Sequence, residues 1–289
     1  MPGETRRAVL AQPDWLRRVP THTKLPNEAR VVFTGCGTSF HAAQTGGWAV
    51  QALEAALKPP LADIMVCISH EGATALTMEA EQAFAGDVWL VTGNPDSELA
   101  VRADEVIVCT PEIERSWCHT ASYTCAVAAI QALNDEEIGW LPEAVEQALL
   151  EDVPRFEQDR VLIIGAGRDW PTAQEAALKL REGAWVDASA VHTEQLLHGP
   201  LAAVDERVRA YVLEGEGLAD DRAHDAVGQL EKLGVETTLV PTSHPVVDAV
   251  RFQLLTLAVA EARGIDPDPI RRTPGSKWAE SAGEPYPYA

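Results

Sequence analysis

Residues 30–39, RVVFTGCGTS, carry the pattern that decides the fold: an apolar run, a glycine-rich loop and the start of an amphipathic stretch. An unbroken apolar run is typical of a strand buried on both faces, and the loop after it suits a turn into a helix. The same order of strand and helix repeats along the chain, which predicts a parallel sheet with right-handed crossovers and helices on both faces. The predicted strands cover residues 30–34, 64–68, 88–91, 105–109, 160–164, 208–213 and 236–239, and the predicted helices cover residues 42–57, 75–84, 121–133, 172–185, 220–233 and 246–262.

The pattern occurs twice, on either side of a polar, acidic segment at residues 139–154 that has proline near both ends. A chain of 289 residues with 46% hydrophobic residues can fill two modest cores. The sequence therefore predicts an α/β protein of two tandem domains, each a three-layer αβα sandwich around a parallel sheet. The predicted parts are an N-terminal helical segment (1–20), a first domain (21–150), and a second domain that includes the C-terminal tail (151–289).

The composition restricts the partners. A formal net charge of −21 argues against nucleic acid and against anionic membrane surfaces, because both need clustered lysine and arginine. A small anionic metabolite stays compatible, since a few local donors can outweigh the average field. The five cysteines are odd in number and lack CxxC spacing, which indicates small core residues in a reducing compartment and no metal framework. No apolar signal core opens the chain and no apolar run could cross a bilayer, so we expect a cytoplasmic protein.

Two loops carry the residue types of a binding site. They follow the first and second predicted strands, and in a parallel sheet the carboxyl ends of strands share the edge where ligands bind. Glycine, hydroxyls and backbone N–H groups at a helix start suit an anion or a sugar hydroxyl, although such hydroxyls also serve as plain N-caps. A dinucleotide-binding loop is disfavoured because neither Gly35-x-Gly37 nor Gly165-x-Gly167 has the third glycine. The predicted binding residues in the two loops are Cys36, Gly37, Thr38, Ser39, Ser69, His70, Glu71 and Thr74.

Two motifs in the second half extend this set: AALKLRE at residues 176–182 and LHGPLA at residues 197–202. With the two loops, they form an ordered set that resembles the sugar isomerase (SIS) family, in particular the isomerase half of glucosamine-6-phosphate synthase. The resemblance spans nearly the whole chain and implies two tandem SIS domains that act on a sugar or sugar phosphate. Only the isomerase half is represented, so we do not expect glutamine-dependent synthesis.

The resemblance implies roles for three residues. Glu182 would move a proton between the sugar carbons C1 and C2. His198 would open the sugar ring from a neighbouring subunit, which implies a homodimer with a shared active site. Lys277, in the C-terminal tail, would contact the open-chain sugar. The residues alone leave alternatives open: Glu182 as a surface charge paired with Lys179, His198 as a capping residue, and Lys277 as a solvated lysine. No cofactor or metal is expected.

The sequence departs from the family at the second loop. Glu71 stands where the family has a phosphate-binding serine, and a carboxylate repels phosphate unless it turns away. His70 would compensate if it were charged, and Trp117 replaces a small residue and would reshape the pocket. The leading hypothesis is an isomerase or deaminase of a hexose or hexosamine phosphate. The alternatives are a non-catalytic sugar sensor and a fructosamine deglycase-like enzyme.

Overall fold

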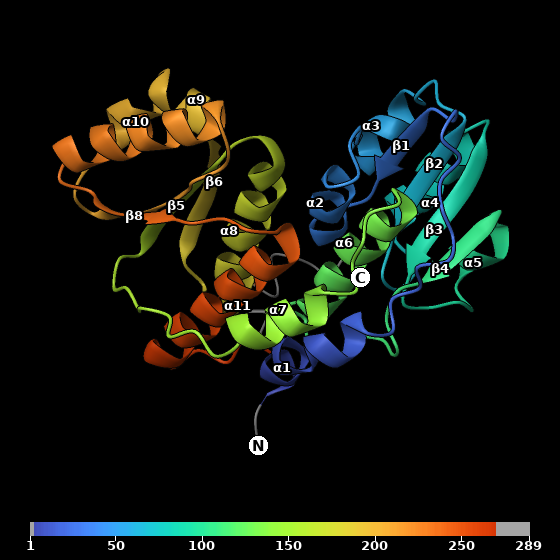
Figure 1. The fold of residues 1–289 in the computed structure, drawn as a ribbon, viewed down its shortest axis with the longest axis horizontal. Coiled ribbons are helices and arrows are strands. Elements are labelled where there is room, and N and C mark those ends of the chain that lie inside the picture. The colour runs from blue at the N-terminus through green and yellow to red at the C-terminus, as the bar shows by residue number, and fades with distance from the viewer. Residues whose placement is uncertain (1–2, 270–289) are drawn as a thin grey trace, which may run out of the picture. The chain divides into compact units, whose positions relative to one another are not determined.

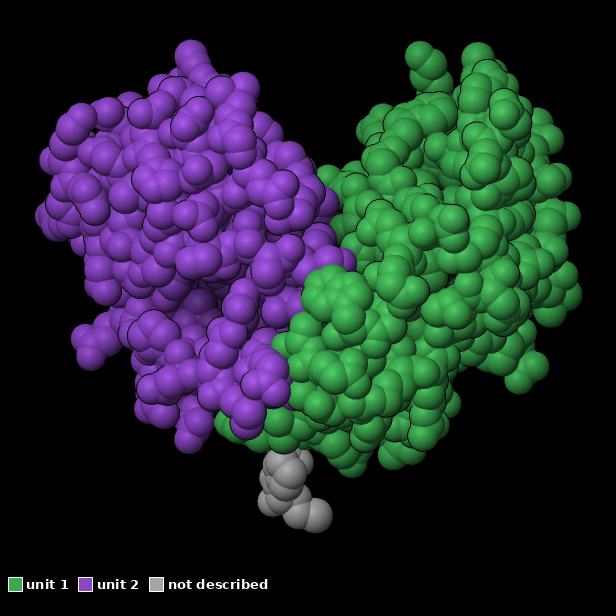
Figure 2. Space-filling model, in the orientation of Figure 1, with its two compact units in different colours: residues 1–146, 268–289 green, residues 147–267 purple. Residues whose placement is uncertain are grey.

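The structure is a computed structural model that describes residues 3–269. The chain divides into two compact units: unit 1 comprises residues 1–146 and 268–289, and unit 2 comprises residues 147–267 (Figure 2). Each unit is built on a four-stranded parallel sheet flanked by helices (Figure 1). The predicted α/β class with parallel sheets is therefore confirmed.

Unit 1 has the strand order β1-β2-β3-β4. Its central strand β2 is buried at every position, because apolar residues point to both faces of a sheet covered on both sides. The helix α6 is also buried throughout. The elements of unit 1 are α1 (Glu4–Leu16), β1 (Val31–Thr34), α2 (Thr38–Gln44), α3 (Ala52–Leu57), β2 (Ile64–Ile68), α4 (Ala75–Ala83), β3 (Asp87–Thr92), α5 (Glu98–Arg102), β4 (Glu105–Val108), α6 (Ala121–Leu133) and α7 (Leu141–Ala148), the last of which ends across the boundary with unit 2.

The predicted helix over residues 42–57 is wrong, because the chain breaks it into α2 and α3. Gly47 has φ +113°, a conformation that a helix does not contain, and a Cβ at Gly46 would lie 2.6 Å from the Phe33 ring. The segment between the two helices runs beside β1, where Phe33 donates to the Trp48 carbonyl and accepts from the Val50 N–H, at 2.9 Å each. The glycine pair therefore lets the backbone approach the sheet.

Unit 2 has the strand order β6-β5-β7-β8. Two apolar clusters cover the opposite faces of this sheet, since Val161 and Ile163 of β5 pack on one side and Leu162 and Ile164 on the other. This alternation gives unit 2 three layers. Its elements are β5 (Arg160–Gly165), α8 (Trp170–Ala184), β6 (Asp187–His192), α9 (Thr193–Leu197), β7 (Val208–Leu213), α10 (Leu218–Lys232), β8 (Glu236–Val240) and α11 (Pro245–Ala262), with short 3-10 turns at Gly167–Asp169 and Pro200–Ala203.

Four of the five cysteines lie in the core, as predicted, and all five are free thiols. The helix α8 packs one stripe of its surface into the core, because Ala173, Ala176, Leu180 and Ala184 are all buried. Among the residues that the structure describes, no helix combines the length and apolar character needed to cross a membrane.

Candidate functional site

A small cavity of about 20 Å³, with both polar and apolar residues in its walls, lies at the carboxyl ends of the unit 1 strands. It has room for about one water molecule, so it would admit a single polar group of a ligand rather than a whole sugar. The first predicted loop supplies Thr38 and Ser39, and the second supplies His70. The other lining residues are Ala42, Ile68, Val91, Cys109, His119, Ser122, Tyr123 and Ala126.

The hydroxyls of the two loops do not serve as N-caps. Gly37 is the N-cap of α2, and although Thr74 is the N-cap of α4, its side chain makes no capping hydrogen bond. Gly37 has φ +54°, so the turn into α2 uses a conformation that glycine adopts without strain. The capping alternative raised from the sequence is thus wrong for Thr38 and Ser39, whereas Thr74 stands at the N-cap position of α4 without a side-chain capping bond.

His70 is held in one tautomer. Its Nε2 accepts a hydrogen bond of 2.9 Å from the backbone N–H of Glu114, which places the proton of the neutral ring on Nδ1. Burial, with a smaller contribution from His119, lowers the pKa of His70 to about 4. The two rings meet edge to face, with centroids 5.4 Å apart. His70 is therefore neutral near pH 7 and cannot supply the positive charge that the sequence suggested as compensation for Glu71.

Glu114 is a site residue that the sequence interpretation missed. It is 4% exposed, and its carboxylate accepts from the backbone N–H groups of Thr120 (2.7 Å) and Ser122 (2.8 Å) and from the Thr120 hydroxyl (2.8 Å). These bonds tie down the start of α6, the helix that carries Ser122 and Tyr123 to the cavity. An acidic residue six positions before a helix N-cap has no sequence signal that separates it from a surface charge.

Several predicted binding residues of unit 1 lie away from the cavity lining. Ser69 and Thr74 pair with each other through their hydroxyls at 3.2 Å, and Cys36 Sγ lies 4.0 Å from Thr77 Oγ1, where burial raises the pKa of the thiol. Glu71 is exposed and is not a lining residue, so its carboxylate does not oppose an anion in the cavity. Trp117 is 37% exposed and is likewise absent from the lining.

Glu182 lies on α8 of unit 2 in a buried charge cluster. Its Oε2 accepts a hydrogen bond of 2.5 Å from Lys179 Nζ, which also lies 3.4 Å from Glu175 Oε1. The side chains of Lys179 and Glu175 are 1% and 2% exposed, and that of Glu182 is 26% exposed. The pairing with Lys179 that the sequence raised is present, but this is not an ordinary charged helix surface. The sequence interpretation missed Glu175, whose spacing of four residues from Lys179 was the available signal.

His198 follows α9 of unit 2, and its side chain is 67% exposed. Its Nε2 lies 2.7 Å from Glu194 Oε1, and Glu194 also accepts from Arg222 at 2.7 Å. Glu182 and His198 thus have separate partners within unit 2. The third predicted catalytic residue, Lys277, lies outside the described residues.

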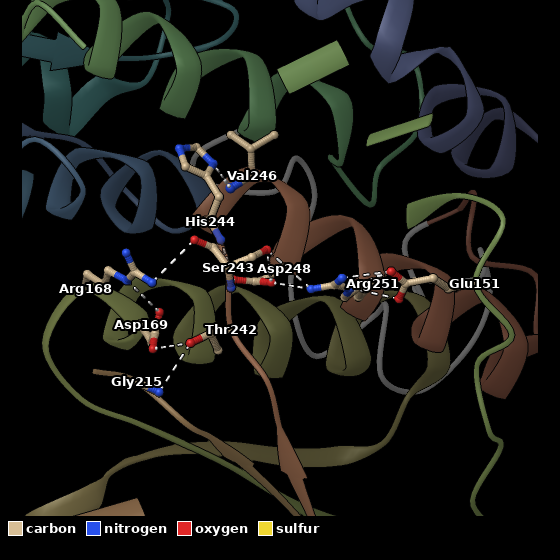
Figure 3. A network of polar contacts seen from close by, with 10 residues as sticks. All are labelled: Glu151, Arg168, Asp169, Gly215, Thr242, Ser243, His244, Val246, Asp248 and Arg251. Atoms are coloured by element: carbon tan, nitrogen blue, oxygen red, sulfur yellow. Dashed lines mark hydrogen bonds and ion pairs between the residues drawn. The ribbon is translucent and has the colours of Figure 1, made fainter. Parts of the chain in front are cut away.

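The carboxyl ends of the unit 2 strands carry a polar network in place of a hydroxyl-lined cavity (Figure 3). Thr242, after β8, accepts from the Gly215 N–H at 3.3 Å and donates to Asp169 at 3.0 Å, so one hydroxyl joins the ends of three strands. Asp248, on α11, accepts from the backbone N–H groups of Ser243 (2.9 Å) and His244 (3.0 Å). Burial raises the pKa of both Asp169 and Asp248.

One group of side chains in unit 2 has the atoms of a metal site. Ligand atoms of Glu214, Asp220 and His224 all lie within 4.8 Å of one another, and His224 Nδ1 is 2.8 Å from Asp220 Oδ1. His224 is exposed and the two carboxylates are half-buried, an arrangement that is common on protein surfaces. We therefore assign no metal to this group.

Sequence comparison finds relatives among aminotransferases, whereas no protein-family model matches the chain. The glutamine–fructose-6-phosphate aminotransferase (isomerizing) of Zymomonas mobilis is 26% identical over 338 residues, which cover 92% of this chain and 56% of the relative. The enzyme of the same name from Thermococcus kodakarensis is 26% identical over 322 residues, covering 89% of this chain and 53% of the relative. The chain thus spans about half the length of the curated relatives it matches.

Solved structures share the fold over nearly the whole chain. A glucosamine-6-phosphate deaminase from Thermotoga maritima superposes with a TM-score of 0.76 at 20% identity, covering 93% of this chain and 98% of that one. The C-terminal domain of a glucosamine-fructose-6-phosphate aminotransferase from Francisella tularensis has a TM-score of 0.76 at 19% identity, with coverage of 93% and 98%. A tagatose-6-phosphate ketose/aldose isomerase from Escherichia coli has a TM-score of 0.72 at 17% identity, with coverage of 95% and 97%. The chain therefore has the fold of these sugar-phosphate enzymes.

Proposed function

We propose that this chain is a sugar-phosphate isomerase built from two tandem SIS domains, which correspond to units 1 and 2. The reaction moves a proton between C1 and C2 of a hexose or hexosamine phosphate. The observation that carries the proposal is the Glu175–Lys179–Glu182 cluster, in which Glu175 and Lys179 are buried and Glu182 is partly exposed, because a carboxylate held by a buried lysine is oriented for proton transfer. The names of the relatives and of the structural neighbours support the sugar-phosphate class.

The unit 1 cavity is the proposed subsite for a sugar hydroxyl or for one oxygen of a phosphate group. Thr38 and Ser39 supply hydroxyl donors there, and the proposed neutral tautomer of His70 carries a donor on Nδ1. Glu71 is exposed, which favours a phosphate ligand and removes the observation that motivated a deglycase, namely a carboxylate facing a cationic amine. The other predicted binding residues, Ser69, Thr74, Cys36 and Trp117, would then shape the loops around the subsite.

In this proposal His198 and Glu182 act in two successive steps, ring opening and proton transfer between sugar carbons. His198 transfers a proton during ring opening, and its exposed position suits a residue that reaches the sugar bound to the neighbouring subunit of a cytoplasmic homodimer. Glu182 then takes the proton from one sugar carbon and returns it to the next, while Lys179 occupies its Oε2. In a 2-amino sugar, hydrolysis of the resulting imine would release ammonia and make the enzyme a deaminase.

The proposal is tested by assaying the purified chain with fructose 6-phosphate and glucosamine 6-phosphate. Glu182→Gln keeps the shape of the side chain but removes the base, so we expect kcat to fall by about 10²- to 10⁴-fold. Glu231→Gln, an exposed position on α10 of the same unit, is the matched control and should retain full activity. Unchanged turnover in Glu182→Gln would overturn the mechanism, and tight sugar binding without any turnover by the wild type would identify a sensor.

A further inference from the structure

His198 stands at a fixed point of the backbone, between two short elements of unit 2. It is the C-cap of α9, and its N–H donates to the Gln195 carbonyl at 3.1 Å. Gly199 follows with φ +143°, a conformation that favours glycine, and its carbonyl accepts from the Ala202 N–H at 2.9 Å. The backbone of His198 is therefore held within a hydrogen-bonded turn.

The carboxylate of Glu194 fixes the ring of His198. Glu194 lies four residues before His198, a spacing that brings side chains together on one face of a helix, and its Oε1 is 2.7 Å from His198 Nε2. Hydrogen bonds from Arg222 and from His198 lower the pKa of Glu194, so its carboxylate is ionised and can only accept. The nitrogen Nε2 therefore carries the proton of this hydrogen bond.

Arg222 of α10 holds the second oxygen of Glu194. Its Nε donates to Glu194 Oε2 at 2.7 Å, and its Nη1 donates to Asp225 on the same helix. The helix α9 packs beside α10 (Figure 1). One oxygen of Glu194 thus serves the imidazole and the other serves the guanidinium, which restricts the carboxylate to one orientation.

This arrangement makes Nδ1 the available nitrogen of His198. In a neutral imidazole one nitrogen donates and the other accepts, so a proton on Nε2 leaves a lone pair on Nδ1. Within residues 3–269, Nδ1 of His198 makes no hydrogen bond, and the side chain is 67% exposed. A ligand can therefore reach Nδ1 without displacing a protein group.

Stability alone does not explain these contacts. The side chains of Glu194 and Arg222 are 42% and 34% exposed, and ion pairs in contact with water contribute little to folding. A carboxylate that holds an imidazole in one tautomer, with the other nitrogen open to a ligand, is instead typical of a histidine that transfers protons.

We propose that Glu194 is a positioning residue for His198, and that Nδ1 of His198 moves the proton when the sugar ring opens. The proposal rests on the proposed isomerase function. The Nδ1 lone pair takes the proton of the anomeric hydroxyl, whose oxygen becomes the carbonyl oxygen as the bond between the anomeric carbon and the ring oxygen breaks. The electron pair of that bond goes to the ring oxygen, which then receives the proton from Nδ1. No further reactant is consumed.

Long-range 1H–15N NMR of the whole chain, labelled with 15N-histidine, reads the tautomer of each neutral ring at about pH 9. We expect His198 to be protonated at Nε2. In the same spectrum His224 should be protonated at Nδ1, which lies 2.8 Å from the Asp220 carboxylate and 3.1 Å from the Asp220 carbonyl. His198→Asn identifies the His198 signals by their loss. Glu194→Gln should give a mixture of His198 tautomers, because an amide both donates and accepts.

Turnover of fructose 6-phosphate separates positioning from a structural role. Glu194→Gln should lower kcat about tenfold and leave KM unchanged, since Glu194 orients the base without itself transferring the proton. Glu194→Asp keeps the carboxylate and should recover part of the loss. Asp220→Asn is the matched control: it breaks the other pair of a histidine and a carboxylate four residues apart on α10, and should keep the wild-type kcat. Thermal melts show whether each variant is folded.

Two results would overturn the proposal. They are protonation of His198 at Nδ1 in the wild type, and equal kcat in Glu194→Gln and Asp220→Asn. A wild type with Nε2 protonated that turns over no sugar phosphate would overturn the proposed function and the ring-opening step, whereas the hold of Glu194 on His198 would be supported.

Discussion

The carboxyl ends of the two sheets carry similar polar residues but differ in how those residues are arranged. Each edge has a half-buried histidine that accepts a hydrogen bond from a backbone N–H: His70 from Glu114 in unit 1, and His244 from Val246 in unit 2. Each also has a buried carboxylate, Glu114 or Asp248, that fixes the start of the following long helix. In unit 1 these groups leave a cavity whose lining includes the hydroxyl residues Thr38, Ser39, Ser122 and Tyr123. In unit 2 the side chains bond to one another.

This difference shows that two units with similar sheets need not have similar sites at the carboxyl ends of their strands. The unit 2 edge combines Asp169 and Asp248, both 1% exposed, with hydrogen bonds from the loops around them. A phosphate would meet two carboxylates there, whereas in unit 1 it would meet Thr38, Ser39 and a neutral His70. The comparison therefore supports the proposal that an anion binds in unit 1 alone, and the predictions below test that proposal.

The largest expected effect comes from removing the two buried carboxylates. Glu114→Ala and Asp248→Ala each leave several backbone N–H groups without acceptors, so each should lower the free energy of unfolding by about 3 to 5 kcal/mol. Chemical denaturation measures both losses. Only Glu114→Ala should also weaken binding of fructose 6-phosphate, since the Glu114 carboxylate fixes the start of α6, the helix that carries Ser122 and Tyr123 to the cavity. Equal loss of fructose 6-phosphate binding in both variants would contradict the proposal that the sugar phosphate binds in unit 1 alone.

A second prediction concerns pH. Burial lowers the pKa of His70 and of His244 to about 4, against 6.5 for an unperturbed histidine. Between pH 6.5 and 4 these histidines are protonated in the unfolded chain but stay neutral in the native chain. The free energy of unfolding is therefore highest above pH 6.5 and decreases as the pH falls toward 4. The largest decrease is about 3 kcal/mol for each histidine.

Denaturation curves at several pH values, compared with His70→Gln and His244→Asn, measure this loss. Each replacement keeps an acceptor for the backbone N–H without a titrating ring, so each should flatten the pH dependence between about pH 6.5 and 4. The raised pKa values of Asp169 and Asp248 act in the opposite direction, since a buried carboxyl gains stability when it is protonated. Unit 2 should therefore lose less stability in acid than unit 1, and a larger loss in unit 2 would count against the assigned network.

The smallest expected effect comes from single hydroxyls. Ser39→Ala should weaken the binding of fructose 6-phosphate about tenfold, because a hydrogen bond to a charged group contributes about 1.5 kcal/mol. Thr242→Val is the matched change in unit 2. It breaks the link between Gly215 and Asp169 and should lower thermal stability while leaving affinity unchanged. Isothermal titration measures both affinities, and a weaker affinity in Thr242→Val alone would reverse the assignment.

Much of the fold was predictable from the sequence, because buried parallel strands such as residues 64–68 and 208–213 are unbroken apolar runs. The strand β6 was missed because Asp187–His192 mixes small, polar and charged residues and does not resemble a buried strand. The helix over residues 42–57 was wrong because Gly46 acts through contact with Phe33 of β1, a tertiary effect. The helices α5, α7 and α9 are short, and their patterns are too brief to identify.

The site was predictable in residue type but not in geometry. Thr38, Ser39 and His70 of the two predicted loops line the cavity, and their role in binding stays a prediction. The exposure of Glu71 and the pairing of Ser69 with Thr74 depend on side-chain directions that spacing does not encode. Glu114 and Glu175 were missed because a buried glutamate and a surface glutamate look alike in a sequence. The roles of Glu182, His198 and Lys277 stay predictions.

A crystal structure of the chain soaked with fructose 6-phosphate tests the central claim most directly. The account predicts density for the phosphate group beside Thr38 and Ser39 of unit 1, within hydrogen-bond distance of their hydroxyls, and no sugar density at the Asp169–Thr242 network of unit 2. Phosphate density at the unit 2 network, or a sugar bound elsewhere with the unit 1 cavity holding only water, would contradict it.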